Sequence, residues 1–122
     1  MSDQKKVLII DDDMDFREMA RIVLESENYQ VLDAATGEEG LEMIKSFSPD
    51  FILLDVMMEE VDSGCKVAYK IATLDIKTPV IMLSSFADEA KQTFDTMAIP
   101  VKEYLQKPLN PEKLIAVVKK YI

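Results

Sequence analysis

The chain has 122 residues, of which 48% are hydrophobic, and we expect it to form a single domain spanning residues 1–122. Its 14 basic and 23 acidic residues give a net charge of −9, which argues against direct binding to nucleic acid or to an anionic membrane and favours a cation or a basic partner. The absence of histidine excludes a histidine base, a histidine metal ligand and a phosphohistidine on this chain.

Cysteine content and hydropathy bear on the cellular setting. Cys65 is the only cysteine, so the chain cannot form an internal disulfide. No apolar stretch at the N-terminus is typical of a signal peptide, and none is long enough to span a bilayer. We therefore expect a cytoplasmic protein without membrane contact.

Apolar runs and helical periodicities alternate along the chain. The runs that indicate buried strands are residues 7–10, 29–34, 51–54, 80–83 and 104–106. The apolar positions that define five helices are Phe16, Met19, Ala20, Val23 and Leu24; Leu41, Ile44 and Phe47; Val67, Ala68, Ile71 and Ala72; Ala87, Ala90, Phe94 and Met97; and Leu114, Val117, Val118 and Tyr121. This alternation is typical of βαβ units and predicts an α/β fold with a parallel sheet covered on both faces.

Several helix starts are marked by capping residues. Capping-box spacing marks the first two helices, through the pairs Asp15 with Glu18 and Thr36 with Glu39. Asn110 followed by Pro111 predicts the start of the last helix. In the second helix we expect Phe47 to point inward with Leu41 and Ile44. Residues 98–103 have no clear period, and we expect a loop there.

Side chains suited to phosphate chemistry follow four of the predicted strands. They are Asp11 and Asp12, Asp55, Ser84, and Lys107. Because parallel strands point the same way, residues just beyond their C-terminal ends meet at one edge of the sheet, where open α/β folds bind ligands. The sequence therefore predicts a site with three carboxylates, a hydroxyl and an ammonium group.

Charge repulsion in this acidic cluster predicts a metal ion. Two carboxylates about 4 Å apart repel by on the order of 4 kcal/mol at an effective dielectric constant near 20, so Asp55 joins Asp11 and Asp12 only with a cation or with protonation. Mg²⁺ fits best, because it prefers oxygen ligands and keeps positions for water and phosphate oxygens. An alternative role for Asp13 is to cap the following helix, where the dipole favours acidic side chains.

In this order and spacing, these residues resemble the receiver domain of two-component response regulators, over essentially the whole chain. The motifs that carry the resemblance are residues 7–13 (VLIIDDD), 51–58 (FILLDVMM) and 107–108 (KP). The resemblance implies a flavodoxin-like, doubly wound five-stranded parallel sheet of order 2-1-3-4-5. It also implies a signalling phosphoacceptor that is not an enzyme acting on other substrates, since it catalyses only its own phosphorylation and dephosphorylation.

The resemblance also implies roles for individual residues. Asp55 would take a phosphoryl group from the phosphohistidine of a sensor histidine kinase or a histidine phosphotransfer protein. The implied Mg²⁺ ligands are Asp11, Asp12, Asp55 and the backbone carbonyl of Met57. Lys107 would stabilise the transferred charge. Ser84 and Tyr104 would switch a protein-interaction surface that an output protein or domain reads.

Two segments depart from the family's pattern. Glu59 stands where the family usually has proline, and the turn that follows is one residue longer than usual. Residues 99–103 replace the small residues that usually precede the switch aromatic. We therefore expect unusual loop geometry at residues 59–64 and an unusual output face at residues 98–103.

Two alternative functions remain open, and a third is disfavoured by the acidic residues. A receiver-like interaction module would keep the fold without accepting phosphate. A haloacid-dehalogenase-like phosphatase would use Asp11 as nucleophile and Asp13 as acid, but it leaves Asp55 without a role. A flavodoxin-like FMN protein shares the strand order, but three acidic residues after the first strand would repel the FMN phosphate.

Overall fold

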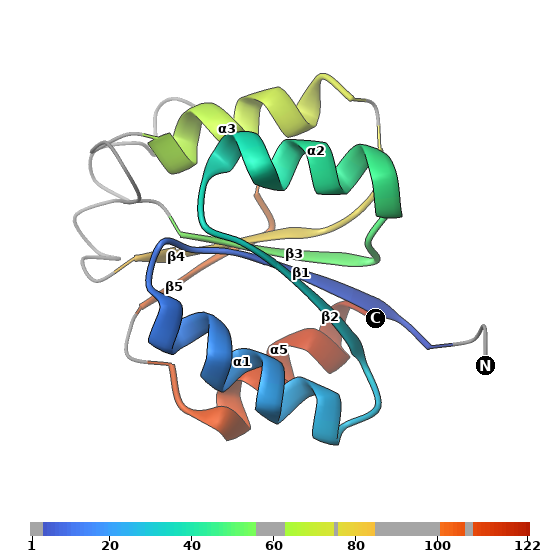
Figure 1. The fold of residues 1–122 in the computed structure, drawn as a ribbon, viewed down its shortest axis with the longest axis vertical. Coiled ribbons are helices and arrows are strands. Elements are labelled where there is room, and N and C mark those ends of the chain that lie inside the picture. Colours follow the sequence, from blue (N-terminus) through green and yellow to red (C-terminus); the bar gives the residue numbers. More distant parts are fainter. Residues whose placement is uncertain (1–3, 56–62, 75, 85–100, 107–108) are drawn as a thin grey trace.

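The computed structural model describes residues 4–55, 63–74, 76–84, 101–106 and 109–122, the side chains of 63–66 and 84 excepted. Strands and helices alternate through these ranges (Figure 1). In chain order the elements are β1 Lys6–Ile10, α1 Met14–Ser26, β2 Gln30–Ala34, α2 Gly37–Phe47, β3 Phe51–Asp55, α3 Ser63–Ala72, β4 Val80–Ser84, β5 Glu103–Gln106 and α5 Pro111–Tyr121.

The five strands form one parallel sheet in the order β2-β1-β3-β4-β5, with β3 at its centre. Helices α2 and α3 cover one face of the sheet, and α1 and α5 cover the other (Figure 1). The predicted doubly wound α/β fold and its strand order are confirmed. The predicted helix around residues 87–97 lies outside the described residues, as do residues 98–100 of the expected loop at 98–103, whereas Glu103 is the first residue of β5.

Alternation along the strands divides the core into two layers, because successive strand residues point to opposite faces. Buried residues of the α2–α3 layer include Leu8, Ile10, Ile44, Ile52, Leu54 and Ile71. Buried residues of the α1–α5 layer include Val7, Ile9, Phe16, Leu24, Phe51, Leu53, Leu114 and Val118. Residues two apart in a strand share a face. Asp33 follows Val31 by two residues and Asp55 follows Leu53 by two, so both acidic residues lie on the α1–α5 side.

Helix α1 is capped by Asp13, two residues before the predicted Asp15–Glu18 capping box. The Asp13 carboxylate accepts hydrogen bonds from the N–H groups of Asp15 (3.0 Å) and Phe16 (3.4 Å). The capping-box prediction is wrong because the N-cap is the last extended residue before the helix, and Asp13 takes that conformation (φ −83°, ψ 106°). The alternative role for Asp13 is confirmed.

Helices α2 and α5 begin at their predicted caps. Thr36 Oγ1 accepts a hydrogen bond from the N–H of Glu39 (3.1 Å), and the Glu39 carboxylate accepts one from the N–H of Ala35 (2.8 Å). Asn110 Oδ1 accepts a hydrogen bond from the N–H of Lys113 (2.8 Å). These caps set the residues at which α2, which follows β2, and α5 begin.

Phe47, predicted to point inward, is 43% exposed. Ile44 is buried and Leu41 packs against the same core layer, as predicted. Helix α2 ends at Phe47, and Ser48 turns the chain in a left-handed conformation (φ 50°), so no further helical turn covers the ring. The prediction for Phe47 is wrong for this reason.

Gly40 provides the close approach of α2 to β1. A Cβ atom at Gly40 would lie 2.5 Å from Cδ1 and 2.8 Å from Cγ1 of the fully buried Ile10. We expect Gly40→Ala to lower the free energy of unfolding by about 1 kcal/mol, since overpacking of about 1–3 kcal/mol exceeds the gain in helix propensity. Urea unfolding measures this. Ile10→Val should partly rescue Gly40→Ala, and strictly additive effects would contradict the assigned contact.

A polar cluster of Glu103, Lys120 and Tyr121 joins β5 to α5. Glu103 Oε2 accepts hydrogen bonds from Lys120 Nζ (2.5 Å) and from the Tyr121 hydroxyl. The hydrogen bond from Lys120, and after it that from Tyr121, lowers the pKa of the Glu103 carboxyl. The same cluster raises the pKa of Tyr121, chiefly through its hydrogen bond to Glu103.

The lowered pKa of Glu103 predicts a contribution to stability that depends on pH. A carboxyl whose pKa is lower in the folded state stabilises the fold above its unfolded pKa, about 4.3 for Glu, and loses that effect as the pH falls through the folded pKa. Glu103→Gln should therefore lower the free energy of unfolding at neutral pH, by at most about 1 kcal/mol because the pair is partly exposed. Urea unfolding at neutral and acidic pH measures the difference. An equal loss at both would contradict the assignment.

Candidate functional site

The C-terminal ends of the strands lie at one edge of the sheet. The register pairs Asp55 of β3 with Leu83 of β4, and Ser84 with Gln106 of β5. On the other side, Asp11 directly follows β1, and its N–H donates to the carbonyl of Ala34 at the end of β2 (3.0 Å). The predicted convergence of strand ends is therefore present in the fold.

Three of the predicted acidic side chains meet at this edge. One carboxylate oxygen from each of Asp11, Asp12 and Asp55 lies within 4.8 Å of the others. Asp11 is completely buried and Asp55 is 5% exposed, whereas Asp12 is exposed. The cluster thus has two carboxylates in the protein interior and one at the surface.

Local hydrogen bonds hold the β1–α1 turn that carries Asp11 and Asp12. Asp11 Oδ1 accepts a hydrogen bond from the N–H of Asp13 (2.9 Å). The carbonyl oxygen of Asp11 accepts one from Arg17 Nη1 (2.7 Å). With the bond from the Asp11 N–H to Ala34, these contacts hold the N–H, the carbonyl and one carboxylate oxygen of Asp11 in place.

The donor set fits a hard divalent cation. Each pair of ionised carboxylates at this spacing repels by on the order of 4 kcal/mol at an effective dielectric constant near 20, and burial of Asp11 and Asp55 adds a desolvation cost. A cation bound among the oxygens removes both costs. Asp12 is exposed, so the cluster is in contact with water at that residue.

The other predicted site residues are placed only in part. Ser84 ends β4 at the site edge, although its side chain lies outside the described part of the structure. Tyr104 lies in β5, is partly buried and packs against the α2–α3 layer. Lys107 and Met57 lie outside the described residues, as do most of the unusual loop residues at 59–64.

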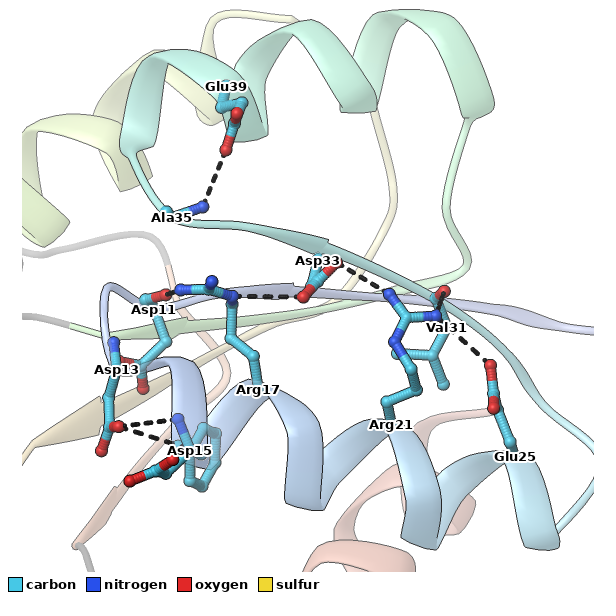
Figure 2. A network of polar contacts seen from close by, with 11 residues as sticks. Asp11, Asp13, Asp15, Arg17, Arg21, Glu25, Val31, Asp33, Ala35 and Glu39 are labelled. Carbon is cyan, nitrogen blue, oxygen red and sulfur yellow. Dashed lines mark hydrogen bonds and ion pairs between the residues drawn. The ribbon is translucent and has the colours of Figure 1, made fainter.

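A charged network that was not predicted from the sequence lies next to the acidic cluster (Figure 2). Asp33 of β2 accepts hydrogen bonds from Arg17 (3.1 Å) and Arg21 (2.7 Å), both on α1. A sequence signal was present, because Asp33 is an acidic residue at an inward strand position and the two arginines lie one helical turn apart. The partner of Arg17 at the site is the main-chain carbonyl of Asp11, and a contact of that kind gives no signal in the sequence.

No helix within the described ranges is long and apolar enough to cross a membrane.

Comparison with known proteins gives a consistent result. Residues 7–119 match the family described as response regulator receiver domain. The chain is 30% identical over 115 residues to the alkaline phosphatase synthesis transcriptional regulatory protein PhoP of Bacillus subtilis, covering 94% of this chain and 47% of that protein. The chain spans about half the length of the curated relatives it matches.

Solved structures agree with the sequence relatives. The CheY-like receiver domain protein of Methanospirillum hungatei superposes with a TM-score of 0.85 at 30% identity, covering 96% of this chain and 92% of that one. The response regulator TrrA of Thermotoga maritima, crystallised in complex with Mg²⁺ and BeF, gives a TM-score of 0.84 at 29% identity, covering 98% and 100%. The chain belongs to the response regulator receiver domain family, the phosphoacceptor domains of two-component signalling.

Proposed function

We propose that Asp55 is the phosphoacceptor and that residues 1–122 form one receiver domain of a two-component phosphorelay. The observation that carries the proposal is the cluster of Asp11, Asp12 and Asp55 at the end of the central strand. Asp55, which ends β3 between β1 and β4, is the carboxylate that the sheet presents at the middle of the site edge.

The transfer that we propose forms one bond and breaks one. A carboxylate oxygen of Asp55 attacks the phosphorus of the donor and forms an acyl phosphate. The bond from phosphorus to the donor imidazole breaks, and its electron pair returns to the imidazole. The donor histidine belongs to a partner, because this chain has no histidine. A sensor histidine kinase or a histidine phosphotransfer protein supplies that chemistry.

Charge stabilisation is the main demand of this reaction, since an anionic nucleophile meets an anionic phosphoryl group. The Mg²⁺ ligands that we propose are Asp11, Asp12, Asp55 and the backbone carbonyl of Met57. A Mg²⁺ ion held there would supply positive charge to offset the negative charge on the phosphoryl oxygens. Lys107 directly follows β5 in the sequence, and we assign it the second positive charge.

We propose that the switch runs through Ser84 and Tyr104. Ser84 ends the strand next to β3, in register with Gln106, which supports a hydroxyl contact with a phosphoryl group on Asp55. Tyr104 lies two residues earlier in β5 and packs partly buried against the α2–α3 layer, which supports coupled movement of its ring. The changed surface would be read by an output protein or domain. A cytoplasmic location stays a prediction.

Acetyl phosphate tests the proposal without a partner. The full chain is incubated with acetyl phosphate and Mg²⁺, and its intact mass is measured. We expect addition of a single phosphate, and no addition when EDTA removes the metal. Failure to add phosphate from acetyl phosphate and from a phosphohistidine donor, with the circular dichroism spectrum of a folded protein, would support the interaction module instead.

A further inference from the structure

Arg17 links the acidic turn to the edge strand β2 (Figure 2). Its Nη1 donates to the carbonyl oxygen of Asp11 (2.7 Å), and its Nε donates to Oδ2 of Asp33 (3.1 Å). The Arg17 side chain is 16% exposed and that of Asp33 is 31% exposed, so both bonds are partly shielded from water. Two bonds from one planar group to two elements fix its orientation.

The bond to Asp11 acts on the peptide that joins Asp11 to Asp12. That peptide is planar, so fixing its carbonyl restrains the backbone torsions on both sides of it. The N–H of Asp11 is fixed by Ala34 (3.0 Å). The bond from Arg17 therefore acts on the peptide from which Asp12 leaves the turn. Because this bond goes to the main chain, it takes up no carboxylate oxygen of the cluster.

We propose that Arg17 is a positioning residue for divalent cation binding, an inference that rests on the proposed function. Arg17 holds the Asp11–Asp12 peptide in the orientation that brings the Asp12 carboxylate to Asp11 and Asp55. Asp33 in turn holds the guanidinium of Arg17 in place and balances its charge. The turn is thereby ordered before the cation arrives, so binding does not have to order it.

Arg21 provides a matched control on the same helix. It donates to the same Asp33 (2.7 Å), to the carbonyl of Val31 (3.0 Å) and to Glu25 (3.3 Å). These partners lie in β2 and α1, and Arg21 itself lies one helical turn further from the acidic turn than Arg17 (Figure 2). Replacing either arginine with methionine removes one positive charge and at least one contact with Asp33. Only the Arg17 variant removes the bond to Asp11.

The direction in which Mg²⁺ affinity changes in Arg17→Met distinguishes three possible roles of Arg17. Loss of a positive charge near an anionic site strengthens the attraction for Mg²⁺, so a purely electrostatic role for Arg17 predicts tighter binding in Arg17→Met. A role in positioning predicts weaker binding. A role limited to fastening α1 to β2 predicts lower stability with unchanged Mg²⁺ affinity.

The experiment measures the Mg²⁺ dissociation constant of the unphosphorylated full chain by isothermal titration calorimetry. We expect Arg17→Met to raise this constant about tenfold, in the range typical of residues that support metal ligands, and Arg21→Met to change it by less than about twofold. Arg17→Lys keeps the charge but cannot bond both acceptors in the same planar geometry, and its dissociation constant should lie between those of wild type and Arg17→Met. If Arg17→Met does not fold, the Mg²⁺ dissociation constant of Arg17→Lys tests the proposal in its place.

A second readout needs no metal. In the metal-free protein, the NMR order parameter of the Asp12 N–H should fall in Arg17→Met and stay unchanged in Arg21→Met. Unchanged or tighter Mg²⁺ binding in Arg17→Met, or equal weakening in both variants, would overturn the assignment to Arg17. A wild-type chain that binds no Mg²⁺ would instead overturn the proposed function and this inference with it.

Discussion

We expect replacement of Asp55 with asparagine to abolish phosphate incorporation from acetyl phosphate, down to the level of the EDTA control. The variant keeps the size of the side chain at the end of β3 but replaces the anionic carboxylate, which is the proposed nucleophile, with a neutral amide. It also removes one of three crowded negative charges, so the metal-free variant should unfold at a higher temperature than wild type. Intact-mass measurement and thermal unfolding by circular dichroism test the two statements.

Asp13→Asn is the matched control for this substitution. Asp13 lies in the same turn as the acidic pair, but its carboxylate caps α1, and asparagine is an equally good N-cap. We expect this variant to keep phosphate incorporation and stability. Incorporation that survives Asp55→Asn and is lost in Asp11→Asn would contradict the assignment and favour a phosphatase-like nucleophile at Asp11.

Replacing Asp12 with alanine should raise the Mg²⁺ dissociation constant by more than about 100-fold, because Asp12 is the exposed carboxylate of the cluster and supplies a direct ligand in the proposed site. The consequence appears in stability. Mg²⁺ at 100 times the wild-type dissociation constant stabilises wild type by about 2.7 kcal/mol, whereas a variant with a 100-fold higher constant gains only about 0.4 kcal/mol. Urea unfolding with and without Mg²⁺ measures both values.

Glu25→Ala controls for the change in net charge. Glu25 lies near the C-terminal end of α1, about 16 Å along the helix from the acidic turn at 1.5 Å per residue. It should retain the full stabilisation by Mg²⁺. Equal stabilisation of the Asp12 and Glu25 variants would show that Asp12 is not a ligand.

Much of the fold follows from patterns that are local in sequence. Apolar runs and helical periodicity locate the described strands and helices, because each pattern reports the same burial that the folded sheet provides. Thr36 and Asn110 are correct caps for a similar reason, since capping needs only residues within one turn. Convergence of the acidic residues also follows, because parallel strands bring their C-terminal ends to one edge.

Features that depend on where a helix begins or ends are harder to predict from the sequence. Which of the three consecutive aspartates is the N-cap of α1 depends on backbone conformation, and Asp13 takes that position. The exposure of Phe47 depends on the chain turning at Ser48. The contact from Arg17 to the Asp11 carbonyl involves a main-chain acceptor, which has the same chemistry at every residue and so carries no sequence signal.

The structure also bears on the phosphatase alternative. In that mechanism Asp13 would be the general acid and must face the phosphate. Here both its hydrogen bonds from Asp15 and Phe16 commit one carboxylate oxygen to the first turn of α1. Asp55, which has no role in that mechanism, is the residue that lies in the cluster with Asp11 and Asp12.

The most direct test of the central claim is to locate the phosphoryl group on the chain. An acyl phosphate reacts with hydroxylamine to give a hydroxamate at the residue that carried the phosphate. The wild-type chain is phosphorylated with acetyl phosphate and Mg²⁺, treated with hydroxylamine, digested and mapped by mass spectrometry. We predict a hydroxamate at Asp55 and at no other residue. A hydroxamate at Asp11 or Asp12, with Asp55 unmodified, would contradict the account.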